Sequence, residues 1–336
     1  MAMSLGWWRC LQVVAVPLLL HFWAAGPQLF DGFSPESLKG RRVLVCGAST
    51  GIGEQLVYQY ARLGAHVAAI ARSETDLRRV TSAAAKLGAA SATPVVADVS
   101  SPEAARNAVE QVLRLKDFEG GLDVLVLNHV IGFWGWMLPE NLTAESASTP
   151  PAALARGEVE LGSTSSVLGG GFDKIQKLFE VNALSYMYLS TVAAPALARS
   201  GFASPGPGGG GQLIVVSSAA GKLGLPKVAP YSSTKHALHG FFDSLRLEFL
   251  AKQLPVFVTL CVLGNIDTEA NKRSTGDDLK HAPKHAPADE TALAIVRGGA
   301  TRQREIYYPL SQGLHYMALL RPFFPTMLDK IALSMI

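Results

Sequence analysis

A tyrosine and a lysine stand four positions apart in the segment Tyr231-Ser-Ser-Thr-Lys235. On a helix, this spacing places both side chains on one face. A lysine ammonium beside a phenol is expected to lower the phenol pKa from its usual value of about 10, which makes Tyr231 a usable general acid or base. Ser218 lies thirteen residues upstream, after an apolar run, where its hydroxyl could bond a substrate oxygen. Serine at such a position is also common in ordinary turns.

A glycine-rich segment, residues 47–53, lies between an apolar run and a helical stretch. Glycines in such a turn let the backbone approach a pyrophosphate, and the helix amino end supplies free N–H groups and positive potential. The segment therefore predicts a dinucleotide site made by Gly47, Ser49, Thr50, Gly51, Ile52 and Gly53.

The second apolar run ends in Arg72-Ser73. Sites that prefer NAD usually carry an acid here for the ribose 2′-hydroxyl, whereas Arg72 and Ser73 can bind a 2′-phosphate through charge-assisted hydrogen bonds. Arg72 could instead be a solvated residue at the start of a helix. We favour NADP(H) as the cofactor.

Short apolar runs alternate with helical stretches along the chain. Continuous apolar strands between helices indicate a parallel sheet that is covered on both faces. The sequence therefore predicts an α/β fold with a single doubly wound Rossmann domain over residues 38–308. Residues 131–171, rich in Ser, Thr, Pro, Gly and Ala, are expected to form a long surface insertion. The predicted strands lie at residues 43–46, 66–70, 93–97, 122–127, 212–216 and 256–263.

The composition excludes several classes of protein. The 336 residues include 30 Lys and Arg against 27 Asp and Glu, and this net charge of +3 is too small to suggest binding to nucleic acid. With 49% hydrophobic and 17% charged residues, the chain is not disordered and can bury a large core. The three cysteines share no metal-ligand spacing, so neither a zinc site nor a disulfide framework is indicated.

Both ends of the chain are apolar. Residues 1–30 contain a hydrophobic run that is expected to be an uncleaved membrane anchor, although a cleaved signal that would lead to secretion is an alternative. Asn141 begins a glycosylation sequon, which matters only if the body is luminal. Residues 313–336 are expected to form two short helical pieces, split by Pro322 and Pro325. In the second piece an apolar face is predicted from Met327, Leu328, Ile331 and Met335, and this face would pack on the body or rest in a membrane interface.

In their order along the chain, the glycine-rich segment, Ser218 and the Tyr231–Lys235 pair resemble the short-chain dehydrogenase/reductase family over residues 38–308, apart from the insertion. Cys46 stands where the family motif usually has Thr. By this resemblance Asp98 and Val99 contact the adenine, and Asn182 completes a tetrad with Ser218, Tyr231 and Lys235. The segment Leu127-Asn128-His129-Val130 takes the place of the usual Asn-Asn-Ala-Gly, and Asn128 is expected to contact the cofactor. The resemblance also implies that Ile266 and Thr268 belong to a loop that closes over the nicotinamide.

Within that family the chain resembles the 11-beta-hydroxysteroid dehydrogenase branch, through residues 121–129, 261–269, 298–302 and 306–308. This implies reduction of steroid-like ketones with NADPH, an anchor in the endoplasmic reticulum membrane and a homodimer. Leu225 stands where that branch carries a tyrosine that contacts the substrate, and Thr50 replaces a basic residue. We therefore expect an oxidoreductase that interconverts an apolar ketone and a secondary alcohol. The alternatives are a retinoid or xenobiotic carbonyl reductase, or a catalytically silent, membrane-associated protein that binds the cofactor.

Overall fold

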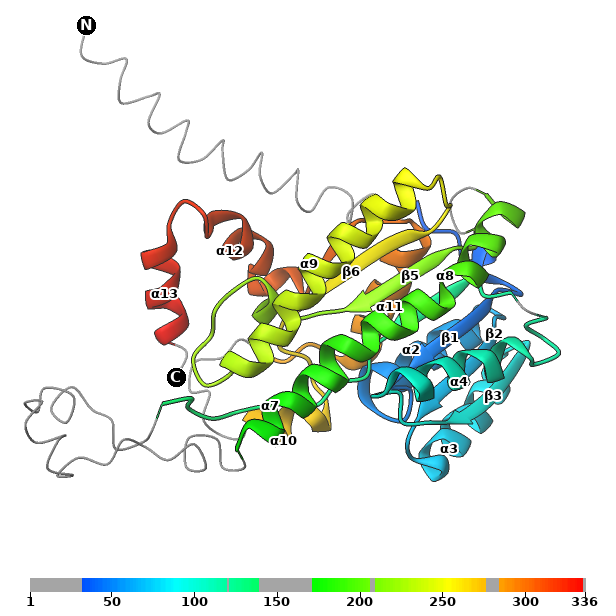
Figure 1. Ribbon diagram of the computed structural model, residues 1–336, viewed down its shortest axis with the longest axis horizontal. Coiled ribbons are helices and arrows are strands. Elements are labelled where there is room, and N and C mark those ends of the chain that lie inside the picture. Colours follow the sequence, from blue (N-terminus) through cyan, green and yellow to red (C-terminus); the bar gives the residue numbers. More distant parts are fainter. Residues whose placement is uncertain (1–31, 120, 139–170, 206–208, 276–283, 335–336) are drawn as a thin grey trace, which may run out of the picture.

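The computed structural model describes residues 32–119, 121–138, 171–205, 209–275 and 284–334. These residues contain a seven-stranded sheet in the order β3-β2-β1-β4-β5-β6-β7 (Figure 1), and all of its neighbouring strands are parallel. The predicted α/β doubly wound fold is confirmed. The strands are β1 (Arg42–Cys46), β2 (His66–Ala71), β3 (Ser91–Val96), β4 (Val124–Leu127), β5 (Gln212–Val216), β6 (Phe257–Leu263) and β7 (Glu305–Tyr308).

The strands are apolar along their length because both faces of the sheet are buried. In β1, Val43 and Val45 point into one hydrophobic cluster, and Leu44 and Cys46 point into the other. This alternation is the period of two that a pleated strand imposes, with apolar residues required on each side.

Helices cover both faces, as Figure 1 shows. One cluster is completed by α2 (Gly51–Arg62), α3 (Glu74–Lys86) and α11 (Ala288–Ala300). The other is completed by α4 (Pro102–Leu113), α8 (Ser185–Ala203) and α9 (Ala229–Ala251). The hydroxyls of Ser73 and Ser101 accept hydrogen bonds from the backbone N–H groups of Asp76 and Ala104, and so they cap α3 and α4.

A further helical stretch was not expected from the sequence. It begins as α7 (Gly171–Phe179), passes through the π-helical turn η2 (Glu180–Leu184) and continues directly as α8. Short π-helical turns inside α-helices occur often at functional sites. This one contains Asn182.

The carboxyl-terminal part confirms the two helical pieces but corrects their predicted face. The helices α12 (Leu314–Leu320) and α13 (Pro325–Leu333) follow the short turn η4 (Leu310–Gln312) and lie at the left of Figure 1. Leu328 is only 2% exposed and packs inward, whereas Met327 and Ile331 are exposed at 46% and 39%. The predicted single face is therefore divided between an inner and an outer side of α13. Met335 lies outside the described residues.

The remaining described elements are the turns η1 (Pro35–Leu38) and η3 (Ala219–Gly221) and the helix α10 (Glu269–Thr275). No helix within the described ranges combines the length and the hydropathy needed to cross a bilayer. The expected anchor at residues 1–30 lies outside those ranges, as does most of the expected insertion, residues 139–170.

Candidate active site

The strand order reverses at β1 and β4, and the glycine-rich segment follows β1 at this point. In open parallel sheets, ligands bind at the carboxyl ends of the strands beside such a reversal. Gly47 has φ +80°, and a Cβ on it would lie 2.5 Å from the Cα of His129. A Cβ on Gly53 would overlap the carbonyl oxygen of Gly47. The amide of Asn128 donates to the same oxygen at 3.1 Å and braces the turn.

The ends of β2 and β3 bring the other expected cofactor residues to the same edge of the sheet. Arg72 and Ser73 follow β2 and are exposed. The Ser73 hydroxyl already bonds Asp76, at 2.7 Å from a carboxylate oxygen. Asp98 follows β3, is exposed and accepts a hydrogen bond from the backbone N–H of Ser100, while Val99 is buried.

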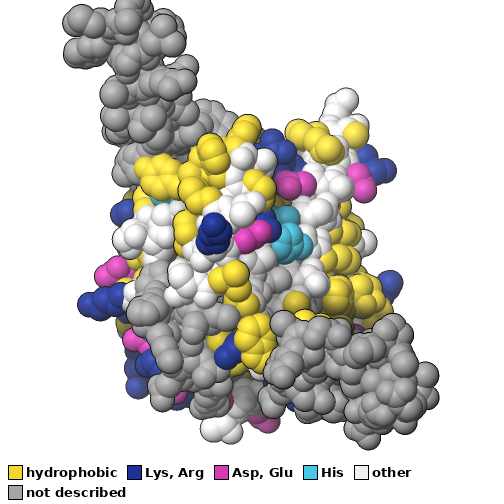
Figure 2. Space-filling model, turned by 90° about the vertical axis from the view of Figure 1, so that its left-hand side faces the viewer, with side chains coloured by type: hydrophobic (Ala, Val, Ile, Leu, Met, Phe, Trp, Pro, Cys, Tyr) yellow, Lys and Arg dark blue, Asp and Glu magenta, His cyan; other side chains and the backbone are white. Residues whose placement is uncertain are grey.

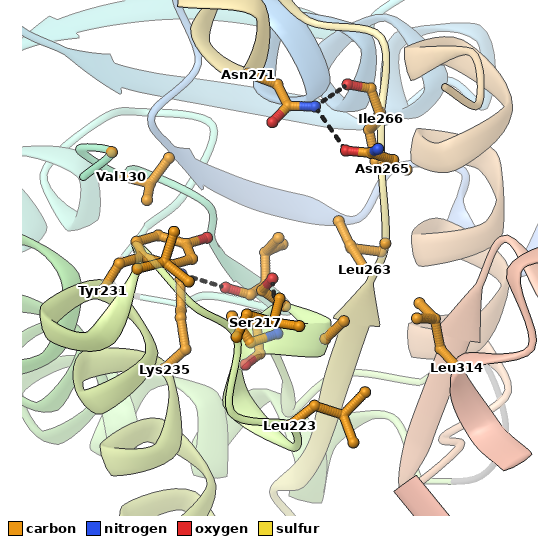
Figure 3. A pocket seen from close by; sticks show the side chains of 18 of the residues that line it. Val130, Ser217, Leu223, Tyr231, Lys235, Leu263, Asn265, Ile266, Asn271 and Leu314 are labelled. Atoms are coloured by element: carbon orange, nitrogen blue, oxygen red, sulfur yellow. Dashed lines mark hydrogen bonds between the residues drawn. The ribbon is translucent and has the colours of Figure 1, made fainter. Parts of the chain in front are cut away.

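Ser218, Tyr231 and Lys235 share one cavity of about 300 Å³, and Figure 3 shows Tyr231 and Lys235 side by side on its wall. Ser218 follows β5 and starts the turn η3, where its hydroxyl accepts from the backbone N–H of Ala220 at 3.2 Å. Tyr231 and Lys235 lie in the first turns of α9. Ser218 also hydrogen-bonds the Tyr231 side chain, so the two hydroxyls can hold one substrate oxygen between them.

Lys235 is a buried cation that is 2% exposed. Its Nζ donates to the carbonyl oxygen of Val216 at 3.1 Å and lies 5.3 Å from the centre of the Tyr186 ring. Burial disfavours the charged form and lowers the pKa of Lys235 to about 7.

The structure corrects the expected pKa of Tyr231. The pKa of this phenol is raised, because burial outweighs the opposing hydrogen bond from Ser218. The Nζ of Lys235 lies 5.8 Å from the centre of the Tyr231 ring and bonds a carbonyl oxygen instead. In the free protein the lysine therefore does not produce the lowering that its spacing from Tyr231 suggested.

Asn182 holds the segment that follows β4. Its Oδ1 accepts from the backbone N–H of Ile131 at 2.9 Å, and its Nδ2 donates to the Ile131 carbonyl at 2.8 Å. Asn182 is fully buried in the π-helical turn. It therefore fixes the start of the loop that borders the cavity.

Apolar side chains from six parts of the chain form much of the cavity wall. Ile52, Ile266 and Thr268, which the sequence predicts as cofactor-binding residues, all line the cavity. Across the cavity from Tyr231, Figure 3 shows Leu314, a residue of α12. Other apolar lining residues are Val130, Phe133, Trp134, Leu223, Leu225, Pro226, Val228, Leu263, Met317 and Ala332.

Three polar residues near the site were missed by sequence reasoning. Ser217 lines the cavity and its Oγ lies 3.1 Å from His239 Nε2. His129 Nε2 lies 2.6 Å from the Ser185 hydroxyl, and burial lowers the pKa of His129 to about 3, so this ring is neutral. Gln312 bonds both the N–H and the carbonyl of Asn265, at 2.9 and 3.2 Å. Each contact joins distant parts of the chain, so spacing alone gave no signal.

Comparison with known proteins agrees with this geometry. The short chain dehydrogenase family matches residues 41–145 and 167–278, which is more than half of the chain. The chain belongs to the short-chain dehydrogenase family. Hydroxysteroid 11-beta-dehydrogenase 1-like protein from Xenopus tropicalis is 40% identical over 281 residues, which cover 84% of this chain and 83% of that one. The protein of the same name from Gallus gallus is 38% identical and covers 91% of this chain and 89% of its own.

Solved short-chain dehydrogenases share the fold. One from Burkholderia cenocepacia, crystallised with NADP, is 26% identical with a TM-score of 0.59, and the match covers 80% of this chain and 96% of that one. One from Mycobacterium marinum is 23% identical with a TM-score of 0.59, over 80% and 94% of the two chains.

The glycine-rich turn fits the pyrophosphate of a dinucleotide. Side chains at Gly47 and Gly53 would overlap the backbone, so the turn remains open to a ligand only because these positions lack a Cβ. The amino end of α2, which begins at Gly51, adds backbone N–H groups beside it.

Proposed function

We propose that the protein interconverts a ketone and a secondary alcohol on an apolar, steroid-like substrate. The observation that carries this proposal is that Ser218 and Tyr231 share a largely apolar cavity with Ile52 and with the loop that contains Ile266 and Thr268. One cavity therefore holds the proton-transferring groups beside the expected cofactor residues.

NADP(H) is the cofactor, and when bound it supplies or accepts the hydride. Residues 47–53 would hold its pyrophosphate, Asp98 and Val99 its adenine, and Arg72 its 2′-phosphate. Asn128 would act by bracing the glycine-rich turn through Gly47. Because Ser73 caps α3, we assign phosphate binding at this strand end mainly to Arg72.

In the reductive direction, Ser218 would hold the carbonyl oxygen and Tyr231 would donate its phenolic proton to that oxygen. In the oxidative direction Tyr231 takes the proton back. Lys235, with a pKa of about 7, can hold or release a proton beside Tyr231 at neutral pH. Asn182 acts through the backbone of Ile131, by fixing the loop at the cavity wall.

Two further properties are part of the proposal. Residues 1–30 would anchor the protein in the endoplasmic reticulum membrane, and the outer side of α13 would add contact with the lipid interface. Figure 2 shows hydrophobic side chains spread over the side of the molecule that carries α12 and α13. A homodimer would cover apolar residues near the end of α9, where Leu247 and Leu250 are exposed.

The decisive experiment follows NADPH oxidation with a panel of ketones, comparing the natural protein with Tyr231→Phe. We expect turnover of apolar ring ketones by the natural protein and a loss of about 10²–10⁴-fold in kcat for the variant. Cofactor binding, measured by NADPH fluorescence, should remain because only the hydroxyl is removed. Turnover that persists in Tyr231→Phe would contradict the mechanism.

The same panel separates the alternatives. Preference for retinal or small xenobiotic carbonyls would favour a carbonyl reductase of that kind. Cofactor binding without turnover of any ketone or alcohol would favour a silent binding protein, although Ser218, Tyr231, Lys235 and Asn182 are all present.

A further inference from the structure

The wall of the substrate cavity includes a short loop without regular secondary structure, residues 131–136. Phe133 and Trp134 of this loop line the cavity, and Trp136 does not. A loop of this kind normally has considerable conformational freedom. Two contacts restrict it here.

The first contact lies at the start of the loop, where Asn182 bonds both backbone polar groups of Ile131. The second lies four residues later, where the backbone N–H of Gly135 donates to the carbonyl oxygen of Lys227 at 2.8 Å. Residues 132–134 are therefore held at both ends. The part of the loop that faces the cavity lies between the two contacts.

Lys227 also contacts the loop through its side chain. Its Nζ lies 5.6 Å from the centre of the Trp134 ring and 5.5 Å from that of Trp136. Both distances are within the range of cation–π attraction. Since Trp134 lines the cavity and Lys227 does not, the ammonium supports this indole from outside the cavity.

The backbone of Lys227 is unusual as well. Its φ is +63°, in the left-handed region that residues with a Cβ rarely adopt. Its neighbours Leu225, Pro226 and Val228 all line the cavity. The left-handed turn thus belongs to a second part of the wall. Lys227 joins it to the loop through the hydrogen bond with Gly135 and the contacts with Trp134 and Trp136.

We infer that Lys227 is a specificity-determining residue, which fixes the Trp134 indole as a flat wall that favours rigid, planar ring ketones over flexible chain ketones. This inference rests on the proposed function and assigns a source to its substrate preference. A flat apolar ring gains contact with a fixed indole at little cost in ordering. A flexible chain of the same carbon number gains less and loses more rotational freedom.

The test compares kcat/KM for a fused-ring ketone and a straight-chain ketone of equal carbon number. Trp134→Ala should reduce kcat/KM for the ring ketone roughly tenfold or more, mainly through KM. Lys227→Met keeps the side-chain length but removes the charge, and should reduce it roughly 2- to 10-fold. For the chain ketone the loss in kcat/KM should be smaller than for the ring ketone in both variants. In Lys227→Met, kcat for a small ketone should change less than about twofold, since Lys227 does not line the cavity.

Two controls isolate the proposed contact. Lys227→Arg retains a cation for both indoles and should keep the natural ring-to-chain ratio. Lys252→Met removes a charge from an exposed lysine that follows α9 and should also leave the ratio unchanged. Thermal unfolding is measured for every variant. If Lys227→Met does not fold, Lys227→Gln, which also removes the charge, takes its place.

Binding without turnover supplies an independent readout. The chain has five tryptophans, so in Trp136→Phe the indole of Trp134 is the only one beyond residue 23. A ring ketone should quench its fluorescence, and Lys227→Met should raise the Kd measured in this titration roughly 2- to 10-fold. If no ketone is reduced, this titration still tests whether Lys227 strengthens the binding of ring ketones beside Trp134. An unchanged ring-to-chain ratio in Lys227→Met that is folded and active would overturn the inference and leave the proposed function standing.

Discussion

At the scale of single residues, the ionisation of Lys235 depends strongly on folding. Its pKa falls from the ordinary value of 10.5 to about 7 because the side chain is buried. Between these two values the unfolded chain binds a proton that the folded protein does not. The free energy of unfolding should therefore rise with pH from about 7 to about 10.5 through this residue.

Lys235→Met tests this coupling. The variant should lose turnover and yet unfold at a higher temperature than the natural protein at pH 7, because it no longer buries a charge. The difference between the two proteins should shrink as the pH rises towards 10. Thermal unfolding of both proteins at a series of pH values provides the measurement. A difference that does not depend on pH would show that Lys235 keeps an ordinary pKa.

Arg72 governs a different property, the choice of cofactor. It lies exposed at the end of β2, where the expected 2′-phosphate would bind. Arg72→Asp removes the guanidinium and adds repulsion, so the ratio of kcat/KM for NADPH to that for NADH should fall by roughly tenfold or more. Steady-state kinetics with both cofactors measure this ratio. If it is unchanged, the phosphate is held by other residues.

At the scale of secondary structure, β1 and β4 are joined at their amino ends by a buried ion pair. Asp123 accepts from the backbone N–H of Arg42 at 2.9 Å and from its Nε at 2.8 Å. The same guanidinium donates to the carbonyl of Phe118 and to the hydroxyl of Ser200. Asp123 is 3% exposed, so its charge depends on this partner and on Arg41, whose Nη1 lies 3.8 Å from Oδ1 of Asp123.

Asp123→Ala should lower the free energy of unfolding by about 3–5 kcal/mol, because it leaves the partly buried Arg42 without its carboxylate. Glu110→Ala breaks an exposed pair between α4 and Arg114, the residue that follows this helix, and should cost less than about 0.5 kcal/mol. Urea unfolding compares the two variants. Because the pair lies at the opposite end of the strands from the cavity, kcat of folded Asp123→Ala should stay close to the natural value. Equal losses in both variants would mean that the buried pair adds no stability.

The strands could be predicted from the sequence because each strand of a sheet that is buried on both faces must be apolar throughout. In the sequence such a strand is a short, continuous apolar run between turns. β5 matches its predicted range, and the other predicted strands shift by a few residues at their ends. The long helix α8 could not be predicted in the same way. It is buried on several sides and contains Pro195, so it shows no clear apolar stripe.

The residues of the site were also predictable only where local sequence determines their arrangement. Ser218, Tyr231 and Lys235 were predictable because local spacing on one helix and one strand end already implies their chemistry. The contacts between Lys227 and Trp134, and between Gln312 and Asn265, depend on loops that only the complete fold brings together. Likewise, the raised pKa of Tyr231 depends on burial, which the spacing from Lys235 does not reveal.

At the scale of the whole molecule, α12 and α13 join the cavity to an exposed apolar surface. Leu314, Met317 and Ala332 line the cavity from the inside. On the outside, Phe323 and Phe324 are 73% and 52% exposed, beside Met327 and Ile331. Exposed apolar groups of this size often mark a site of interaction. A lipid interface here would place the cavity next to the medium in which apolar substrates dissolve.

Binding to phosphatidylcholine vesicles tests this arrangement in protein that lacks residues 1–30. We expect weak binding that the double change Phe323→Ser and Phe324→Ser reduces several-fold, since each removes a ring that can enter the interface. Phe202→Ser alters an equally exposed ring on α8 and serves as the control. Vesicle flotation measures the bound fraction. If the shortened protein does not bind at all, the outer side of α13 is not a membrane contact.

The position of the two contacts that hold residues 131–135 has a consequence for how this chain can change in evolution or by design. Both contacts are made by backbone atoms of the loop, at Ile131 and at Gly135. Backbone contacts of this kind remain when a side chain between them is replaced. Phe133, which lines the cavity, can therefore be exchanged for another residue while the loop stays held. The range of substrates could change in this way without altering the chemistry at Tyr231.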